Sequence, residues 1–143
     1  MCDEESNNIG DVVPDDVVLY RALDRKNQLS DDKKQIREIA FQKAGKLPKH
    51  KDGLSFRTSA EACNTRDHYG ILEIKVGDIH GLERNLEVRF DANDPSHILL
   101  RNLPCIDREE EKERAEAVSS ELAWVAKPHS ITPYKRPRSD PKP

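Results

Sequence analysis

Among the five histidines of the sequence, His97 is the best placed for chemistry. Ser96-His97 directly precedes the apolar run Ile98-Leu99-Leu100, so we expect this imidazole at the mouth of a strand, where active-site groups often lie. A histidine hydrogen-bonded at a strand edge is the structural alternative. None of the five pairs with another histidine, a cysteine or an acid at metal-ligand spacing, so no metal site is expected.

Familiar catalytic motifs are missing from the sequence. There is no G-x-S-x-G, no H-E-x-x-H, no C-x-x-C and no glycine-rich phosphate loop, and the chain has only six glycines. The three cysteines form an odd, sparse set that favours a reducing compartment over a disulfide scaffold. The acidic N-terminus does not resemble a signal peptide, and no apolar window is long enough for a membrane span. We therefore expect a cytoplasmic protein without a membrane role, and we leave open whether it is an enzyme.

The charge is distributed in blocks. The 143 residues carry a net charge of −3, with 36% charged and 35% apolar residues. Residues 1–16 contain six acids and no base, whereas five prolines and five bases lie beyond residue 126. These patterns predict an acidic flexible tail at 1–16, a folded domain at 17–126 and a basic, proline-rich disordered tail at 127–143.

The apolar pattern of the central segment predicts an α+β domain with a mostly antiparallel sheet and about three helices. Alternating apolar residues indicate strands near 17–23, 54–56, 69–76, 86–90 and 98–100. Helical spacing and capping residues indicate helices over 31–44, through Cys63, and from Asp107 to Ala126.

Basic residues concentrate in the segment predicted as the first helix. Lys33, Lys34 and Arg37 belong to this group, and the C-terminal tail is also basic. Such a patch could neutralise phosphates of a nucleic acid, which is one alternative function. The low aromatic content, 5%, leaves little surface for base stacking, and a solvated helix face is the simpler interpretation.

Trp124 lies near the end of the last predicted helix, next to the proline-rich tail. A tryptophan at the edge of a domain can anchor a protein interface, although it more often closes the core. Together with the absence of catalytic motifs, this position favours a small accessory or binding protein that acts through a protein partner.

Two short strings resemble the opening of ADP-ribosyltransferase-like domains: Tyr20-Arg21 in the first predicted strand, and Gly53-Leu54-Ser55 before a small helix that contains Glu61. The resemblance implies an NAD-binding domain in which Arg21 binds a phosphate and Ser55 orients the ribose, with His97 as a further candidate residue of the site. Such enzymes usually carry a catalytic glutamate on a late strand, and the late strands here offer only Glu87 or the non-equivalent His97. If the resemblance does not hold, no cofactor is expected.

A broader resemblance runs over residues 18–104. The ordered strings LYRAL, DGLSF, EIKVGDI and DPSHILL look like those of small bacterial proteins with an opening LYR, a central GLS and a late D-P-x-H turn. This resemblance implies a bacterial source and similar domain limits, and it conveys no established activity.

Overall fold

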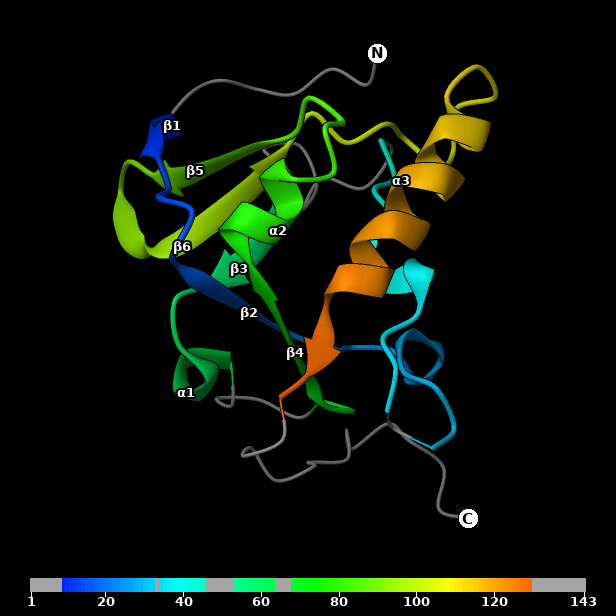
Figure 1. Ribbon diagram of the computed structural model, residues 1–143, viewed down its shortest axis with the longest axis horizontal. Helices are drawn as coiled ribbons and strands as arrows, with labels where there is room; N and C mark the ends of the chain where they lie inside the picture. The colour runs from blue at the N-terminus through cyan, green and yellow to red at the C-terminus, as the bar shows by residue number, and fades with distance from the viewer. Residues whose placement is uncertain (1–8, 33, 46–52, 64–67, 130–143) are drawn as a thin grey trace.

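The computed structural model describes residues 9–32, 34–45, 53–63 and 68–129. They form one antiparallel sheet of seven strands in the spatial order β1-β5-β6-β3-β2-β4-β7, together with three α-helices and two 3-10 helices (Figure 1). The strands are β1 (Ile9–Val12), β2 (Val18–Ala22), β3 (Leu54–Arg57), β4 (Ile71–Lys75), β5 (Glu87–Asp91), β6 (Asp94–Arg101) and β7 (Lys127–Pro128). The helices are η1 (Lys26–Gln28), η2 (Glu38–Phe41), α1 (Ala60–Cys63), α2 (Val76–His80) and α3 (Lys112–Val125). The predicted α+β class is confirmed.

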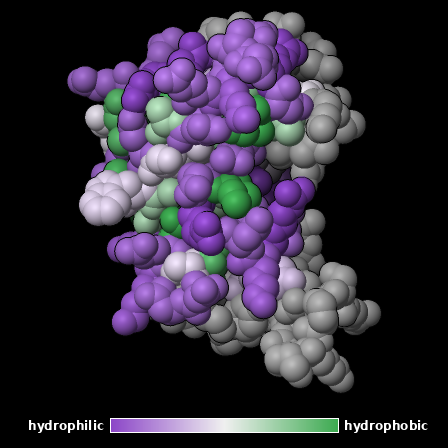
Figure 2. Space-filling model, turned by 90° about the vertical axis from the view of Figure 1, so that its right-hand side faces the viewer, coloured by the Kyte–Doolittle hydropathy of each residue, from purple (hydrophilic) through white to green (hydrophobic). Residues whose placement is uncertain are grey.

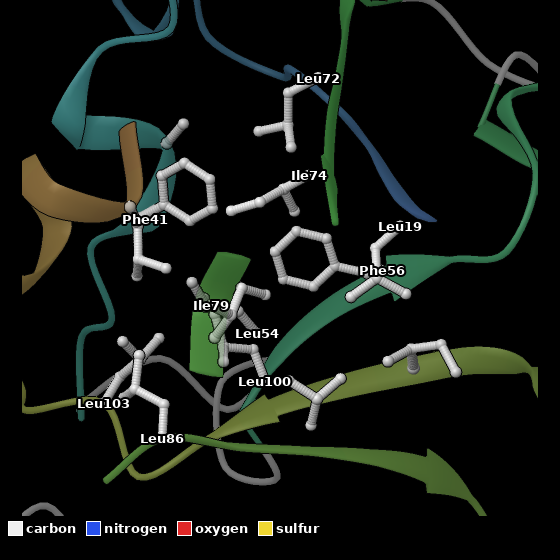
Figure 3. Close-up of a cluster of buried hydrophobic side chains, with 14 of the residues drawn as sticks. Leu19, Phe41, Leu54, Phe56, Leu72, Ile74, Ile79, Leu86, Leu100 and Leu103 are labelled. Carbon is white, nitrogen blue, oxygen red and sulfur yellow. The ribbon is translucent and has the colours of Figure 1, made fainter. Parts of the chain in front are cut away.

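The hydrophobic core lies between the sheet and the layer that contains α2, α3 and η2 (Figures 1 and 3). Apolar side chains from alternate positions of the strands point into this layer, because successive residues of a strand face opposite sides. The rings of Phe41 and Phe56 are stacked with centroids 6.2 Å apart, joining η2 to β3. We call the opposite side of the sheet the outer face.

The ordered sheet extends beyond the predicted domain limits at both ends. β1 lies within the expected acidic tail and pairs with β5, and Val13 just after it is fully buried. At the other end, Lys127 and Pro128 pair with Glu73 and Leu72 of β4. Residues 1–8 and 130–143, the remainder of the two predicted tails, lie outside the described residues.

The helix predicted over 31–44 is absent from the described residues of that segment, and this prediction is wrong. Instead, Ser30 and Asp32 bond to neighbouring backbone groups: Lys34 N donates to Asp32 Oδ1 over 3.0 Å and Gln35 N donates to Ser30 Oγ over 3.0 Å. The backbone then turns back, and Leu29 pairs with Ile36 in an isolated β-bridge. Local side-chain bonds of this kind compete with helix formation, and only the short η2 remains helical.

Two cysteines are described. Cys63 is buried and is not part of a disulfide. Cys105 is fully buried and disulfide-bonded, which differs from the expectation that the sparse cysteines of this chain do not serve as disulfides.

Candidate functional site

The three residues proposed for an NAD site do not converge. Ser55 and His97 both lie on the outer face, because β3 and β6 pair Ser55 with Leu99 and Arg57 with His97. Arg21 lies on the other side of the sheet: its guanidinium sits 5.6 Å from the centroid of the Phe56 ring in the core layer. Its hydrogen bond to Ser55, 3.0 Å long, reaches the backbone carbonyl rather than the hydroxyl. Arg21 therefore cannot hold one ligand position together with Ser55 and His97 in this structure.

The imidazole of His97 is hydrogen-bonded to a carboxylate. Its Nδ1 lies 2.9 Å from Oδ2 of Asp91, and both side chains are about one-fifth exposed. This hydrogen bond, helped by one from the backbone N–H of Asn93, keeps the pKa of Asp91 below its usual value. An ionised carboxylate can only accept, so Nδ1 carries the proton and the imidazole orientation is fixed. The pair resembles the carboxylate–histidine arrangement that orients catalytic and ligand-binding imidazoles.

The binding residues predicted from the basic segment and from Trp124 do come together, apart from Lys33, which lies outside the described residues. Lys34 and Trp124 line the same groove, which has a volume of about 310 Å³. Arg37 is exposed next to the groove residues Ile36 and Glu38. The segment after Ser30 and the C-terminal half of α3 thus form the two walls of one site.

The floor of the groove is apolar and its rim carries both charges. Its full lining is Lys34, Gln35, Ile36, Glu38, Ser120, Ala123, Trp124 and Ala126. Ile36 is 5% exposed and is held in the core, whereas Trp124 is 86% exposed and forms a wall that stands out into solvent. Figure 2, a view onto the α3 side, shows apolar residues as small separate patches among hydrophilic ones. The rim offers one base, Lys34, and one acid, Glu38.

A second acid near Trp124 is already paired. Glu121 lies one helical turn before Trp124 on α3 and accepts hydrogen bonds from Arg84, one from Nε at 3.0 Å and one from Nη2. The bond to Arg84 lowers the pKa of Glu121, so this carboxylate stays ionised and its charge is balanced. The groove lining itself therefore carries one base, Lys34, whose charge also acts on the neighbouring carboxylate of Asp32, and one acid, Glu38.

The sequence analysis identified only some residues of the groove and only some of those around His97. Ser120 of the groove gave no signal, and Ile36 was predicted only as an apolar residue of the helix expected over 31–44. Arg57 and Asp91, which share the outer face with His97, were also missed. For Arg57 a signal existed: the alternation Leu54-Ser55-Phe56-Arg57 puts Ser55 and Arg57 on the same side of the strand.

No protein-family model, no curated protein and no solved structure matches this chain. Both resemblances stated for the sequence therefore remain predictions. None of the helices within the described ranges is long and apolar enough to cross a membrane. The same part of the chain contains no group of three or more His, Cys, Asp or Glu residues that could hold a metal ion.

Proposed function

We propose that this chain is a small binding protein that docks a protein partner at the groove between α3 and the segment after Ser30. The observation that carries the proposal is the contrast at this groove: an 86% exposed indole stands beside an apolar floor whose Ile36 is buried. Tryptophan is strongly buried on average and is among the commonest residues to dominate interface energies. An indole left in solvent next to an apolar hollow is suited to become buried on binding.

The lining favours a protein over a nucleic acid as the partner. A phosphate backbone is bound chiefly by Lys and Arg, whereas the groove lining contains one base and one acid. A protein segment that inserts one apolar side chain and carries an acid and a base beside it would complement Ile36, Lys34 and Glu38. The volume, about 310 Å³, lies at the lower end of small-ligand pockets, which suits a single anchor side chain.

The proposed location is the cytoplasm of a bacterium. The support for the cytoplasm is the odd, sparse set of three cysteines, a composition that favours a reducing compartment. The disulfide at Cys105 weighs against it, since disulfides are rare in the cytosol.

The test uses a displayed library of random short peptides selected on the full chain. We expect selected peptides to share an apolar residue flanked by charges, and to bind the Trp124→Ala variant at least about tenfold more weakly, because a central anchor contributes about 2 kcal/mol or more. The matched control is Val12→Ala, which truncates another large apolar residue that is exposed in the described part of the chain and should leave affinity unchanged. In Lys34→Glu, affinity should fall and return when the acid of the peptide is replaced by lysine.

Three outcomes would overturn this function. Equal binding by the wild type and Trp124→Ala would show that the groove is not the site. A library that yields no binder would show that the groove lacks affinity for polypeptide. Tight, strongly salt-dependent binding of a single-stranded oligonucleotide at Trp124 would show that the partner is a nucleic acid instead.

A further inference from the structure

A row of polar side chains crosses the outer face of the sheet. His97 of β6 pairs in register with Arg57 of β3, Arg57 with Tyr20 of β2, and Tyr20 with Glu73 of β4. Residues directly opposite each other on adjacent strands share a face, and their side chains are near neighbours. Arg57 and His97 are therefore adjacent hydrogen-bond donors on the side of the sheet opposite the core.

Each of these two side chains is hydrogen-bonded to a carboxylate of its own. Asp91 holds His97 through Nδ1, and Asp94 Oδ2 lies 3.2 Å from Nη1 of Arg57. Asp94 also accepts hydrogen bonds from the hydroxyl of Ser96, at 2.7 Å, and from its backbone N–H. These bonds to Ser96, followed by the one from Arg57, keep the pKa of Asp94 below its usual value. Both carboxylates therefore stay charged and fix the side chains that they bind.

The outward ends of both donors have hydrogen-bonding capacity left. Arg57 uses one of its five N–H groups on Asp94, and His97 uses Nδ1 on Asp91. Three nitrogen atoms have no hydrogen-bond partner within the described residues: Nε and Nη2 of Arg57, and Nε2 of His97. The side chain of Arg57 is 41% exposed and that of His97 is 20% exposed, so both can be reached from solvent.

The charge of the outer face differs in sign from that of the whole chain. The charged residues that the strand registers place there are the bases Arg57, Lys75, Arg89, Arg101 and Lys127 and the acids Glu73, Glu87, Asp91 and Asp94. These are five bases and four acids, with His97 counted as neutral, although the net charge of the chain is −3. Next to the two donors themselves lie the carboxylates of Asp91 and Asp94, so anion binding there depends on hydrogen bonds from both donor side chains rather than on the charge of the whole face.

We propose that Arg57 and His97 together bind the phosphate group of a small ligand on the outer face of the sheet. The planar guanidinium matches the spacing of phosphate oxygens, and Nε2 of His97 supplies a second donor when the ring is protonated. The next member of the row, Tyr20, packs its ring edge-to-face against the ring of His129, with centroids 5.2 Å apart. This site lies on the opposite side of the sheet from the layer that contains α3, and it is independent of the proposed function.

The test is a titration of the full chain with inorganic phosphate and with glycerol phosphate, followed by NMR of the Arg57 Nε–H group and the His97 ring. We expect saturable shifts at both side chains. Affinity should fall at least about tenfold in Arg57→Gln and in His97→Gln, since a hydrogen bond to a charged group contributes about 1.5–3 kcal/mol. Lys75→Gln, which removes an exposed base from the same face, is the matched control and should bind as the wild type does.

Comparing the two ligands and a salt control distinguishes the possible outcomes. Tighter binding of glycerol phosphate than of phosphate would identify a phosphomonoester as the ligand, and the reverse would identify free phosphate. Shifts that rise linearly and are reproduced by sodium chloride at equal ionic strength would overturn the proposal. Arg57→Lys keeps the charge, so if Arg57→Gln fails to fold, an unchanged affinity in Arg57→Lys would equally contradict the role of the guanidinium fork.

Discussion

Trp124 and Ile36 line one groove, although one is 86% exposed and the other only 5% exposed. The two residues are far apart in sequence and come from different elements, α3 and the turn that follows Ser30. Ile36 is packed in the core, whereas the indole of Trp124 is exposed to solvent. A partner should therefore be able to contact the indole without breaking a contact within the folded protein. This relationship makes stability and binding separable at this site.

Truncating Trp124 should therefore leave the fold intact. For Trp124→Ala we expect the free energy of unfolding to change by less than about 0.5 kcal/mol, as is usual for exposed positions. Leu122, two residues earlier on α3, is fully buried, and Leu122→Ala should cost about 2–5 kcal/mol. Urea denaturation of the two variants measures both values. A large loss in Trp124→Ala would show that the indole closes the core, contrary to our account.

Filling the groove should block binding while Trp124 is kept. Ser120 is exposed on α3 and lines the groove, so Ser120→Phe places a ring where the anchor of the partner would lie. We expect the selected peptides to lose affinity at least about tenfold, as for loss of a central anchor. The control is Lys112→Phe, an equally exposed position at the start of α3 and outside the groove lining. Unchanged affinity in Ser120→Phe would place the peptide elsewhere on the protein.

The junction between β3 and β6 depends on one glycine. Gly53 has φ of +115°, and a Cβ atom added there would lie 2.5 Å from the carbonyl oxygen of Leu100. For Gly53→Ala we expect a loss of at least about 1–3 kcal/mol in the free energy of unfolding, from backbone strain alone. Gly81 has φ of −64°, a conformation open to alanine, so thermal unfolding of Gly81→Ala should show a smaller loss. Equal losses in the two variants would contradict this description of the junction.

The Asp91–His97 pair makes a contribution to stability that depends on pH. Because the pKa of Asp91 is lowered in the folded protein, the contribution is present above the usual carboxyl pKa of about 3.9 and is lost as pH falls through the folded value. We expect wild type to be more stable than Asp91→Asn at neutral pH, with a difference that shrinks below about pH 4. Denaturation curves across pH measure it. A difference independent of pH would show that the carboxylate is not held by His97.

The sheet could be predicted from the sequence more fully than the site. Strands such as Leu54–Arg57 and Ile71–Lys75 show the alternation that a half-buried strand requires. The short helix expected through Cys63 is present as α1, where Ser59 Oγ accepts from Ala62 N over 3.2 Å. The segment after Ser30 has helical spacing of Ile36, Ile39 and Ala40, but side-chain bonds from Ser30 and Asp32 close a turn first. Helical spacing alone does not reveal that competition.

The candidate sites depend on contacts between distant segments, and this is why sequence reasoning found only parts of them. Lys34 and Trp124 were each singled out, for a nucleic acid and for a protein partner respectively, without any sign that they share one groove. Arg21 was assigned to a phosphate by resemblance, whereas the register of Tyr20 with Arg57 turns Arg21 to the core side. Register is set by pairing across the sheet, which a single strand does not encode.

The emission spectrum of Trp124 tests the docking groove most directly, because it is the only tryptophan of the chain and reports on no other position. The measurement is the fluorescence of the full protein as a selected peptide is added, with and without iodide as a quencher. Our account predicts an emission shift to shorter wavelength and loss of quenching, both saturating with peptide and both absent in Ser120→Phe. Emission that stays unshifted and fully quenchable while the peptide binds would contradict it.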